Sequence, residues 1–588
     1  MTTRGLRATL TLALLSLLAV SVRAADLGPL PVTVGTGLKV PMRDGVALAA
    51  DVYRPAGEGR FPVLLTRTPY DRRDPQTGLV LASHGYVVVL QDTRGRFGSE
   101  GEFSPFRNEA ADGYDTVEWA AVLPYANGKV GMFGGSYVGA TQMLAAMGHP
   151  PHLVAIQPYV TASEYYEGWT YQGGALMEWF VSSWSSGLAV DTLRRKAEAL
   201  AHPRDWVETV PMQDYRLLDL PTVASLAPYL REWMAHPTRD AYWRDTRVSD
   251  HYGEMTVKGL HRTGWHDIFS RGAIENFMGL RAQAATPEAR AGQRLMVGPW
   301  AHGATSLDGK IGDVAFGMAA VVDENELLLK WAAFTLKDEA NEYATGAPVR
   351  LFVMGDNAWR DEQEFPLARA QSTRYYLHAA KGANSISGDG ALSTKAPRQE
   401  RPDQFDYDPA KPVRTLGGRL CCGVQYLPGP ADQRPNESRP DVLVYSTPPL
   451  DHDLEVTGFI TAEIQAATSA VDTDFTAMLV DVDPGGYARY LADGIVRARY
   501  RHSREQAEPL VPGRIETYAI DLWATSNVFK AGHRLRLYVS SSNFPRFDRN
   551  PNTGEPAAAA TRQAPAHQTV YHDAAHPSAL ILPVIPRP

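Results

Sequence analysis

Short apolar runs alternate with amphipathic segments through the first 160 residues. Turn residues bound each run, as expected for buried strands, and the clearest examples are PVLLTR (62–67), YVVVLQD (86–92) and KVGMFGG (129–135). Between them, residues 112–123 and 137–150 carry apolar side chains at helical spacing. Strands that alternate with helices predict parallel pairing, so the fold class is α/β.

Two later stretches break this alternation. Residues 161–249 are rich in aromatic side chains and helical spacing, which predicts a helical cap inserted into the α/β domain. We therefore expect a discontinuous catalytic domain over residues 25–160 and 250–365. From residue 366 to 588, strand-like runs separated by Gly, Pro and Asp predict a β-sandwich of the jelly-roll kind.

Residues 1–24 have the pattern of a secretory signal peptide. A short basic start precedes an apolar run over residues 8–22, and small side chains at Val22 and Ala24 favour cleavage before Ala25. The alternative is a retained N-terminal anchor. No other apolar run is long enough to cross a bilayer. We expect an exported protein, periplasmic or secreted, without stable membrane insertion after cleavage.

Charge and cysteine content exclude several function classes. The 588-residue chain has a formal net charge of -8 and no long Lys/Arg run, which argues against nucleic acid as a partner. Its two cysteines, Cys421 and Cys422, are adjacent, so they form a vicinal disulfide or stay reduced. Metal-binding CxxC spacing is absent. We expect no zinc site and no part for either cysteine in catalysis.

The stretch GGSYVG, residues 134–139, holds a candidate nucleophile. Ser136 follows an apolar run directly and precedes a predicted helix, a position that exposes a serine hydroxyl on a tight turn. The second glycine of the usual G-x-S-x-G pattern is displaced to Gly139. The alternative is a structural serine near the start of a buried helix.

An acid and a histidine follow in the order that such nucleophiles require. Asp267 and His302 each come just after an apolar run, so both are expected at the carboxyl ends of strands. A serine needs such a base to remove its proton. Asp267 could instead be a helix N-cap, and His302 a structural histidine. His266 is an alternative candidate for the base, although it is adjacent to Asp267 and adjacent side chains on one turn point in different directions.

Several motifs, in order, resemble the cocaine esterase-like serine hydrolases, a family that includes X-prolyl dipeptidyl-peptidases, α-amino-acid ester hydrolases and glutaryl-cephalosporin acylases. The resemblance extends from about residue 32 to near the C-terminus. It rests on RTPYDR, QDTRGRFGSEGEF, GKVGMFGGSYVGATQ, TGWHDIF, GPWAHG and VRLFVMGDNAWRDE. It implies an α/β-hydrolase core, a helical cap and a C-terminal jelly roll.

The resemblance also implies roles for individual residues. Ser136 is the expected nucleophile, Asp267 the acid and His302 the base, while the Tyr70 hydroxyl and the backbone N–H of Tyr137 form the oxyanion hole. The implied activity is cleavage of a small ester, or an amide, through an acyl-enzyme without metal or cofactor. An X-Pro dipeptidyl-peptidase or acylase is the alternative enzyme. The alternative outside the enzymes is a binding protein with an inactive hydrolase core. The sequence does not determine the oligomeric state, and a homo-oligomer is one possibility.

Substrate preference is predicted only in part. The amino-ester hydrolases of this family carry extra carboxylates after the acid, where this chain has Ile268, Phe269 and Ser270, so α-amino substrates are disfavoured. Glu164 and Glu167 of the cap could compensate, but we expect them on a solvated face. An apolar substrate pocket is expected to draw on aromatic side chains, with candidates Trp169, Trp179, Phe180 and Phe269.

Overall fold

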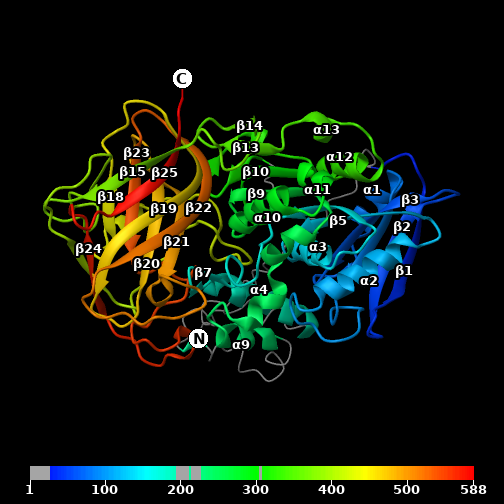
Figure 1. Ribbon diagram of the computed structural model, residues 1–588, viewed down its shortest axis with the longest axis horizontal. Coiled ribbons are helices and arrows are strands. Elements are labelled where there is room, and N and C mark those ends of the chain that lie inside the picture. The colour runs from blue at the N-terminus through cyan, green and yellow to red at the C-terminus, as the bar shows by residue number, and fades with distance from the viewer. Residues whose placement is uncertain (1–26, 194–210, 213–226, 304–307, 588) are drawn as a thin grey trace, which may run out of the picture.

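The protein consists of an α/β lobe and a β-sandwich lobe that lie side by side, with the cap at their lower junction in the view of Figure 1. The computed structural model describes every residue except 1–26, 194–210, 213–226, 304–307 and 588. The expected signal peptide therefore lies outside the described residues. Among the described helices, none combines the length and apolar character needed to span a bilayer.

A ten-stranded sheet forms the centre of the α/β lobe. Its order is β1 (Val32–Pro41), β2 (Ala47–Pro55), β4 (Val87–Asp92), β3 (Phe61–Thr68), β5 (Ala126–Gly135), β6 (Leu153–Tyr159), β9 (Lys258–His266), β10 (Gln293–Ala301), β13 (Val349–Val353) and β14 (Ala358–Glu362). From β4 to β13 all neighbours are parallel, whereas β1, β2 and β14 pair antiparallel with their neighbours. The predicted α/β fold class is confirmed.

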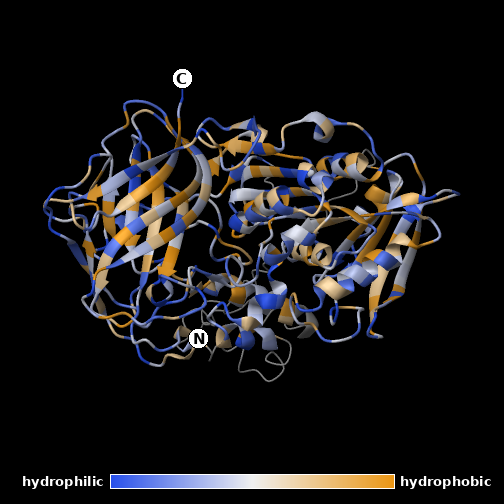
Figure 2. Cartoon of the chain, viewed as in Figure 1, coloured by the Kyte–Doolittle hydropathy of each residue, from blue (hydrophilic) through white to orange (hydrophobic). Residues whose placement is uncertain are grey.

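Helices cover both faces of this sheet. They are α1 (Pro75–Ser83), α2 (Glu109–Ala121), α3 (Tyr137–Met147), α10 (Ser270–Gln283), α11 (Pro287–Ala291), α12 (Glu324–Leu336) and α13 (Glu342–Thr345). Helices α2 and α3 pack on one apolar face, whereas α1 and α12 pack on a second, distinct core. Hydrophobic residues accordingly concentrate on the strands in Figure 2.

The described part of the cap is mostly helical. It comprises a short hairpin, β7 (Tyr171–Gln172) and β8 (Ala175–Leu176), then α4 (Glu178–Leu193), α9 (Pro228–Ala235) and the 3-10 helices η3 (Ala241–Thr246) and η4 (Val248–Glu254). Most of its aromatic side chains are buried in the same core as α3. Hydrophobic burial therefore holds the cap directly over the start of α3.

The C-terminal lobe is a mainly antiparallel β-sandwich, as predicted. Its strands are β15 (Gln371–His378), β16 (Ala391–Ser393), β17 (Asp403–Tyr407), β18 (Leu443–Ser446), β19 (Leu454–Thr468), β20 (Asp474–Val482), β21 (Ala488–Arg497), β22 (Glu516–Phe529), β23 (Arg534–Ser540), β24 (Ala566–Tyr571) and β25 (Ala579–Ile585). Between the lobes lie β11 (Lys310–Ile311), β12 (Val314–Ala315) and η5 (Met318–Ala320), and short helices in the sandwich are α14 (Arg434–Glu437), η6 (Ala498–Tyr500) and η7 (Ala557–Ala559).

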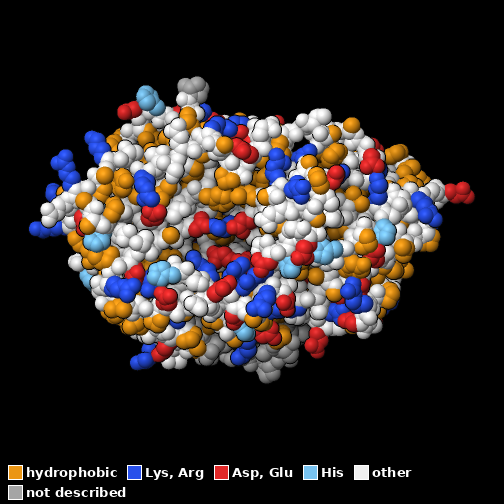
Figure 3. Space-filling view, viewed as in Figure 1, with side chains coloured by type: hydrophobic (Ala, Val, Ile, Leu, Met, Phe, Trp, Pro, Cys, Tyr) orange, Lys and Arg blue, Asp and Glu red, His pale blue; other side chains and the backbone are white. Residues whose placement is uncertain are grey.

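The two lobes share one hydrophobic core and a polar seam. Apolar side chains from β10, β13 and α10 pack with the inner face of the sandwich. The end of β13 also pairs with β22, since Met354 N–H donates to Ser526 O at 3.0 Å. Arg360 bridges Glu455 at 2.7 Å, and charged side chains gather on the visible face where the lobes meet (Figure 3). This seam fixes loops of the sandwich against the α/β lobe.

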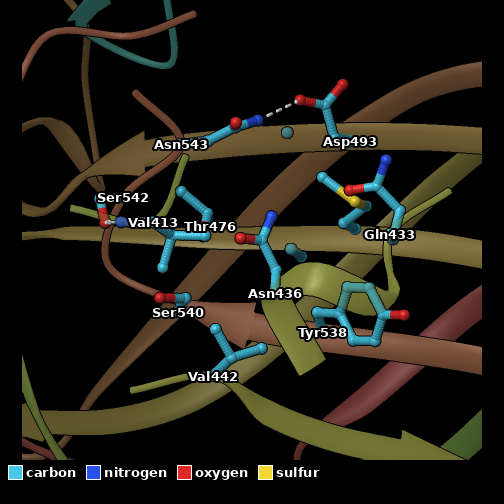
Figure 4. Close-up of a pocket in the computed structure, with 13 residues that line it drawn as sticks. Val413, Gln433, Asn436, Val442, Thr476, Asp493, Tyr538, Ser540, Ser542 and Asn543 are labelled. Carbon is cyan, nitrogen blue, oxygen red and sulfur yellow. Dashed lines mark hydrogen bonds between the residues drawn. The ribbon is translucent and has the colours of Figure 1, made fainter. Parts of the chain in front are cut away.

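A small cavity lies inside the sandwich. Its lining includes Asn436, Thr476 and Tyr538, and across it Asn543 Nδ2 donates to Asp493 Oδ2 at 3.0 Å (Figure 4). The space suits water rather than an organic substrate.

Candidate active site

Ser136 lies on a sharp turn between β5 and α3. Its backbone has φ 60° and ψ -126°, in a region that costs a non-glycine residue about 1–3 kcal/mol. Small neighbours are required here, because a Cβ on Gly134 would lie 2.3 Å from Val138 and one on Gly135 would lie 2.7 Å from Tyr159. The two glycines therefore permit the turn that presents the serine at the N-terminus of α3.

A continuous chain of hydrogen bonds links the three predicted triad residues. His302 Nε2 lies 3.0 Å from Ser136 Oγ, and His302 Nδ1 lies 2.7 Å from Asp267 Oδ1. The serine follows β5, the aspartate β9 and the histidine β10, so the carboxyl ends of three parallel strands bring together residues far apart in sequence. The carboxylate is buried, and the arrangement can carry a proton from serine to imidazole.

Tyr70 lies at the same edge of the sheet, two residues after β3. The next residue, Asp71, has φ 98°, and this tight turn directs the tyrosine side chain. Tyr70 as a whole is 42% exposed, but its hydroxyl accepts a hydrogen bond from Trp184 Nε1 at 2.9 Å. Burial of the hydroxyl raises the pKa of Tyr70 to about 12, while hydrogen bonding to Trp184 and Ser136 opposes the shift. The phenol therefore keeps its proton at neutral pH.

Tyr137 is the first residue of α3, so its backbone N–H has no acceptor within the helix. Its side chain is held elsewhere: the hydroxyl donates to Glu109 Oε1 at 2.9 Å and accepts from the Phe106 N–H at 2.9 Å. These bonds fix the helix start beside the nucleophile. The helix dipole adds partial positive charge at this point, which suits a developing oxyanion.

Aromatic side chains form a wall beside His302. Phe269 meets the His302 ring edge to face, with centroids 5.0 Å apart, and Trp169 stacks on Phe269 at 4.2 Å. Phe180 lies 5.2 Å from Phe269 and is also buried. Three of the four predicted pocket residues are thus brought together next to His302.

The fourth, Trp179, lies elsewhere. Its ring packs on Tyr426 at 4.7 Å and shares a small core with Leu420 and Phe544 of the sandwich lobe. Helix α4 presents successive side chains to different directions, so Trp179 faces the sandwich while Phe180 faces the aromatic wall.

The loop that covers Trp179 carries the two cysteines. Cys421 and Cys422 form a vicinal disulfide, with Cys421 buried and Cys422 exposed. One nitrogen of His302 and both sulfur atoms lie within 4.8 Å of one another. The sandwich therefore folds this loop back onto His302, a proximity that the positions of the cysteines in the sequence did not predict.

The competing interpretations of the triad residues do not fit the geometry. Neither ring nitrogen of His266 has a hydrogen-bond partner among the described residues, and burial lowers its pKa well below the usual range, aided by Arg419 and Arg489. It is a neutral core residue rather than the base. Asp267 does not cap α10, whose N-cap residue is Phe269.

The two cap glutamates are not on a solvated face, so that expectation was wrong. Glu164 is buried and pairs with Arg239 at 2.8 Å, and burial raises its pKa to about 7 despite this arginine. Glu167 accepts from the Gly173 N–H at 3.0 Å. Glu167 also lies 3.7 Å from Arg504 Nε of the sandwich, so both carboxylates serve structural contacts of the cap.

Sequence reasoning missed two polar residues, one that contacts Asp267 and one that contacts the end of β9 before it. Thr263 Oγ1 donates to Asp267 Oδ2 at 2.8 Å, and its place near the end of β9, four residues before Asp267, was the available signal. Arg419, fully buried, donates from Nε to Trp265 O at 3.3 Å and from its Nη atoms to backbone carbonyls of β22. No sequence signal pointed to Arg419, because the sandwich brings it from more than 150 residues away.

Two family models match the chain. Residues 44–304 match the X-Pro dipeptidyl-peptidase (S15 family) model, and residues 341–581 match the X-Pro dipeptidyl-peptidase C-terminal non-catalytic domain. The first range contains all three triad residues, and the second contains the cysteine loop.

Similar proteins cover nearly the whole chain. A cocaine esterase from Rhodococcus sp. (strain MB1 Bresler) is 39% identical over 94% of this chain and 99% of its own length. An aminopeptidase from a marine sediment archaeon, Thaumarchaeota archaeon, superposes with a TM-score of 0.78 at 27% identity, covering 96% of this chain and 98% of that one. An α-amino acid ester hydrolase also gives 0.78 at 27% identity, over 95% and 97%. The chain therefore belongs to the CocE/NonD and X-Pro dipeptidyl-peptidase (S15) family of serine hydrolases.

Proposed function

We propose that this protein hydrolyses carboxylic esters through an acyl-enzyme on Ser136. The observation that carries the proposal is the hydrogen-bonded chain from Ser136 through His302 to Asp267, at 3.0 and 2.7 Å. The similarity to a cocaine esterase over nearly the full length supports an ester rather than an amide.

In the first step, His302 Nε2 takes the proton of Ser136 as its oxygen attacks the ester carbonyl. Asp267 accepts the hydrogen bond from Nδ1 and stabilises the imidazolium that forms. The negative charge on the former carbonyl oxygen is met by the Tyr70 hydroxyl and the Tyr137 N–H. The imidazolium then protonates the leaving alcohol, and water cleaves the acyl-enzyme with the same groups in reversed roles.

The proposed substrate has an apolar group next to the scissile carbonyl and no α-ammonium group. Phe269 and Trp169 supply a buried apolar wall beside His302. Ile268 and Phe269 occupy the positions directly after the acid and are both buried, so no carboxylate stands there to bind a cation.

A substrate panel tests the proposal. The purified enzyme is assayed with p-nitrophenyl esters of acetic, butyric and benzoic acid and with Xaa-Pro p-nitroanilides. We expect kcat/KM to be highest for an ester, and a strong preference for the anilides would favour the dipeptidyl-peptidase alternative. Ser136→Ala is the control: it should abolish turnover and labelling by a fluorophosphonate probe while the unfolding temperature stays within a few degrees of wild type.

We further propose that the enzyme is exported. The basic start and the apolar run over residues 8–22 support this proposal. N-terminal sequencing of protein recovered from the periplasm or medium should begin at Ala25. Recovery of the intact N-terminus from the cytoplasm alone would contradict it.

A further inference from the structure

The vicinal cysteine pair and the catalytic base together present three metal-ligand side chains. The two sulfur atoms and one His302 nitrogen lie within 4.8 Å of one another, and this is the one such group of three among the described residues. Nδ1 of His302 is already hydrogen-bonded to Asp267 at 2.7 Å, so Nε2 is the nitrogen available to a metal. In the oxidised form both sulfur atoms are bonded to each other, so neither is a thiolate that can bind a metal.

We propose that reduction of the Cys421–Cys422 disulfide creates a zinc site, formed by the two thiolates and His302 Nε2, whose occupation switches off the catalytic base. The inhibitory part of this proposal rests on the proposed function, whereas metal binding itself does not. Two thiolates and an imidazole are a soft donor set that favours Zn²⁺ over Mg²⁺ or Ca²⁺. A fourth position remains for water.

The distances are compatible with such a site. Zinc bonds sulfur at about 2.3 Å and nitrogen at about 2.0–2.1 Å, so tetrahedral ligand atoms stand roughly 3.6 Å apart. The ring nitrogen and the sulfur atoms, at most 4.8 Å apart, therefore need to approach one another by about 1 Å, and the two sulfur atoms need to separate from each other. Rotation of the cysteine side chains supplies both movements once the S–S bond is broken.

The orientation of the imidazole is already that of a metal ligand. Metal-bound histidines usually donate their second ring N–H to a carboxylate, which fixes the ring. Asp267 is the carboxylate that accepts this hydrogen bond here, and Thr263 in turn donates to its second oxygen at 2.8 Å. Zinc on Nε2 would displace the Ser136 hydroxyl, so the site and the catalytic proton transfer exclude each other.

The reaction balances with a dithiol as the reductant. The dithiol attacks the S–S bond, most directly at the exposed Cys422 sulfur, and leaves as its own disulfide, so two electrons and two protons pass to the cysteines. Zn²⁺ then replaces the two thiol protons, which go to solvent, and accepts the Nε2 lone pair. Because the disulfide joins adjacent residues, it closes no long loop, and the fold is expected to survive reduction.

The test uses the full chain and Co²⁺ as a spectroscopic substitute for Zn²⁺. Protein reduced with a dithiol and desalted under inert gas should bind one Co²⁺ per chain, with thiolate-to-cobalt absorption that added Zn²⁺ removes. The oxidised protein should show neither. Near-UV circular dichroism checks that the reduced protein stays folded, and thiol titration checks that both sulfurs are free.

Variants assign the ligands. In Cys421→Ser/Cys422→Ser the absorption should vanish. In His302→Gln, Co²⁺ affinity should fall by about tenfold or more. His567→Gln removes an exposed histidine of the sandwich and should bind as wild type does. The single variants Cys421→Ser and Cys422→Ser need no reductant, keep one thiolate each, and should bind Co²⁺ with intermediate affinity.

Activity gives the second readout. Zn²⁺ should inhibit ester hydrolysis by the reduced enzyme, and a chelator should restore the activity. The double variant should keep its own metal-free rate when Zn²⁺ is added. No cobalt–thiolate absorption in folded, reduced protein would overturn the proposal, as would unchanged affinity in His302→Gln. Metal binding without turnover of any ester would instead refute the proposed function and leave the site standing.

Discussion

Replacing Tyr70 with phenylalanine removes one of the two proposed oxyanion donors and leaves the ring in place. The hydroxyl stands at the strand end beside Ser136, where Trp184 Nε1 holds it at 2.9 Å. Loss of one oxyanion-hole donor typically lowers kcat about 10²–10³-fold, or roughly 2.7–4 kcal/mol of transition-state stabilisation. We expect a fall in this range with little change in KM, since the donor acts on charge that develops after binding.

The pKa of Tyr70 sets the pH dependence of this effect. Because burial raises it to about 12, the wild-type hydroxyl keeps its proton until the pH approaches that value. The ratio of wild-type to Tyr70→Phe activity should therefore stay constant from about pH 6 to about pH 9. A ratio that falls within this interval would mean that the hydroxyl loses its proton there and is therefore not buried.

Stability is measured alongside, because Trp184 loses its acceptor in Tyr70→Phe. An unpaired buried N–H costs about 1–3 kcal/mol, which should appear as a lower Tm but not as a lower kcat. Tyr159→Phe is the matched control: this half-buried tyrosine packs against the same turn, and its buried hydroxyl has no hydrogen-bond partner among the described residues. If both variants lose kcat equally, or if Tyr70→Phe loses less than about fivefold, the oxyanion assignment is refuted.

Three further changes test other parts of the structure. Asp267→Asn should lower kcat by about 10⁴ in ester hydrolysis, because His302 would then hold the wrong tautomer; a loss below tenfold would contradict its role. Phe269→Ala should lower kcat/KM for benzoyl esters by on the order of tenfold more than for acetyl esters, and equal losses would place the acyl group elsewhere. In the sandwich, burial alone would lower the pKa of His572, but its two carboxylate partners outweigh this and raise the pKa. The charged His572 therefore stabilises the fold fully below about pH 6.5, and this stabilisation is lost as pH rises through the raised pKa. The Tm difference between wild type and His572→Gln should shrink between about pH 5.5 and about pH 9. An unchanged Tm difference would refute this link between protonation and stability.

Local sequence was sufficient wherever the determining forces act over a few residues. Strands such as β5 could be predicted because their apolar runs are buried whatever the partner. Ser136 could be singled out because its glycines permit a turn that other residues would obstruct. Asp267 and His302 became candidates because each directly follows such a strand.

Long-range packing decided the remainder. Whether Trp179 or Phe180 faces the base depends on which lobe packs on each side of α4, and helical periodicity is the same for both. Glu164 can be buried because it pairs with Arg239, 75 residues away along the chain. No local pattern encodes such pairings.

The sequence by itself determined the α/β core, the sandwich and the identity of the three side chains that can carry the proton transfer, because apolar periodicity and turn chemistry act locally. The tertiary structure alone decided that the sandwich would carry Arg419 to the strand of the acid and Cys421 and Cys422 to the base. The physical reason is that these contacts form when the two lobes bury a common apolar surface. Neither the spacing nor the type of these residues in the sequence indicates how the lobes pack.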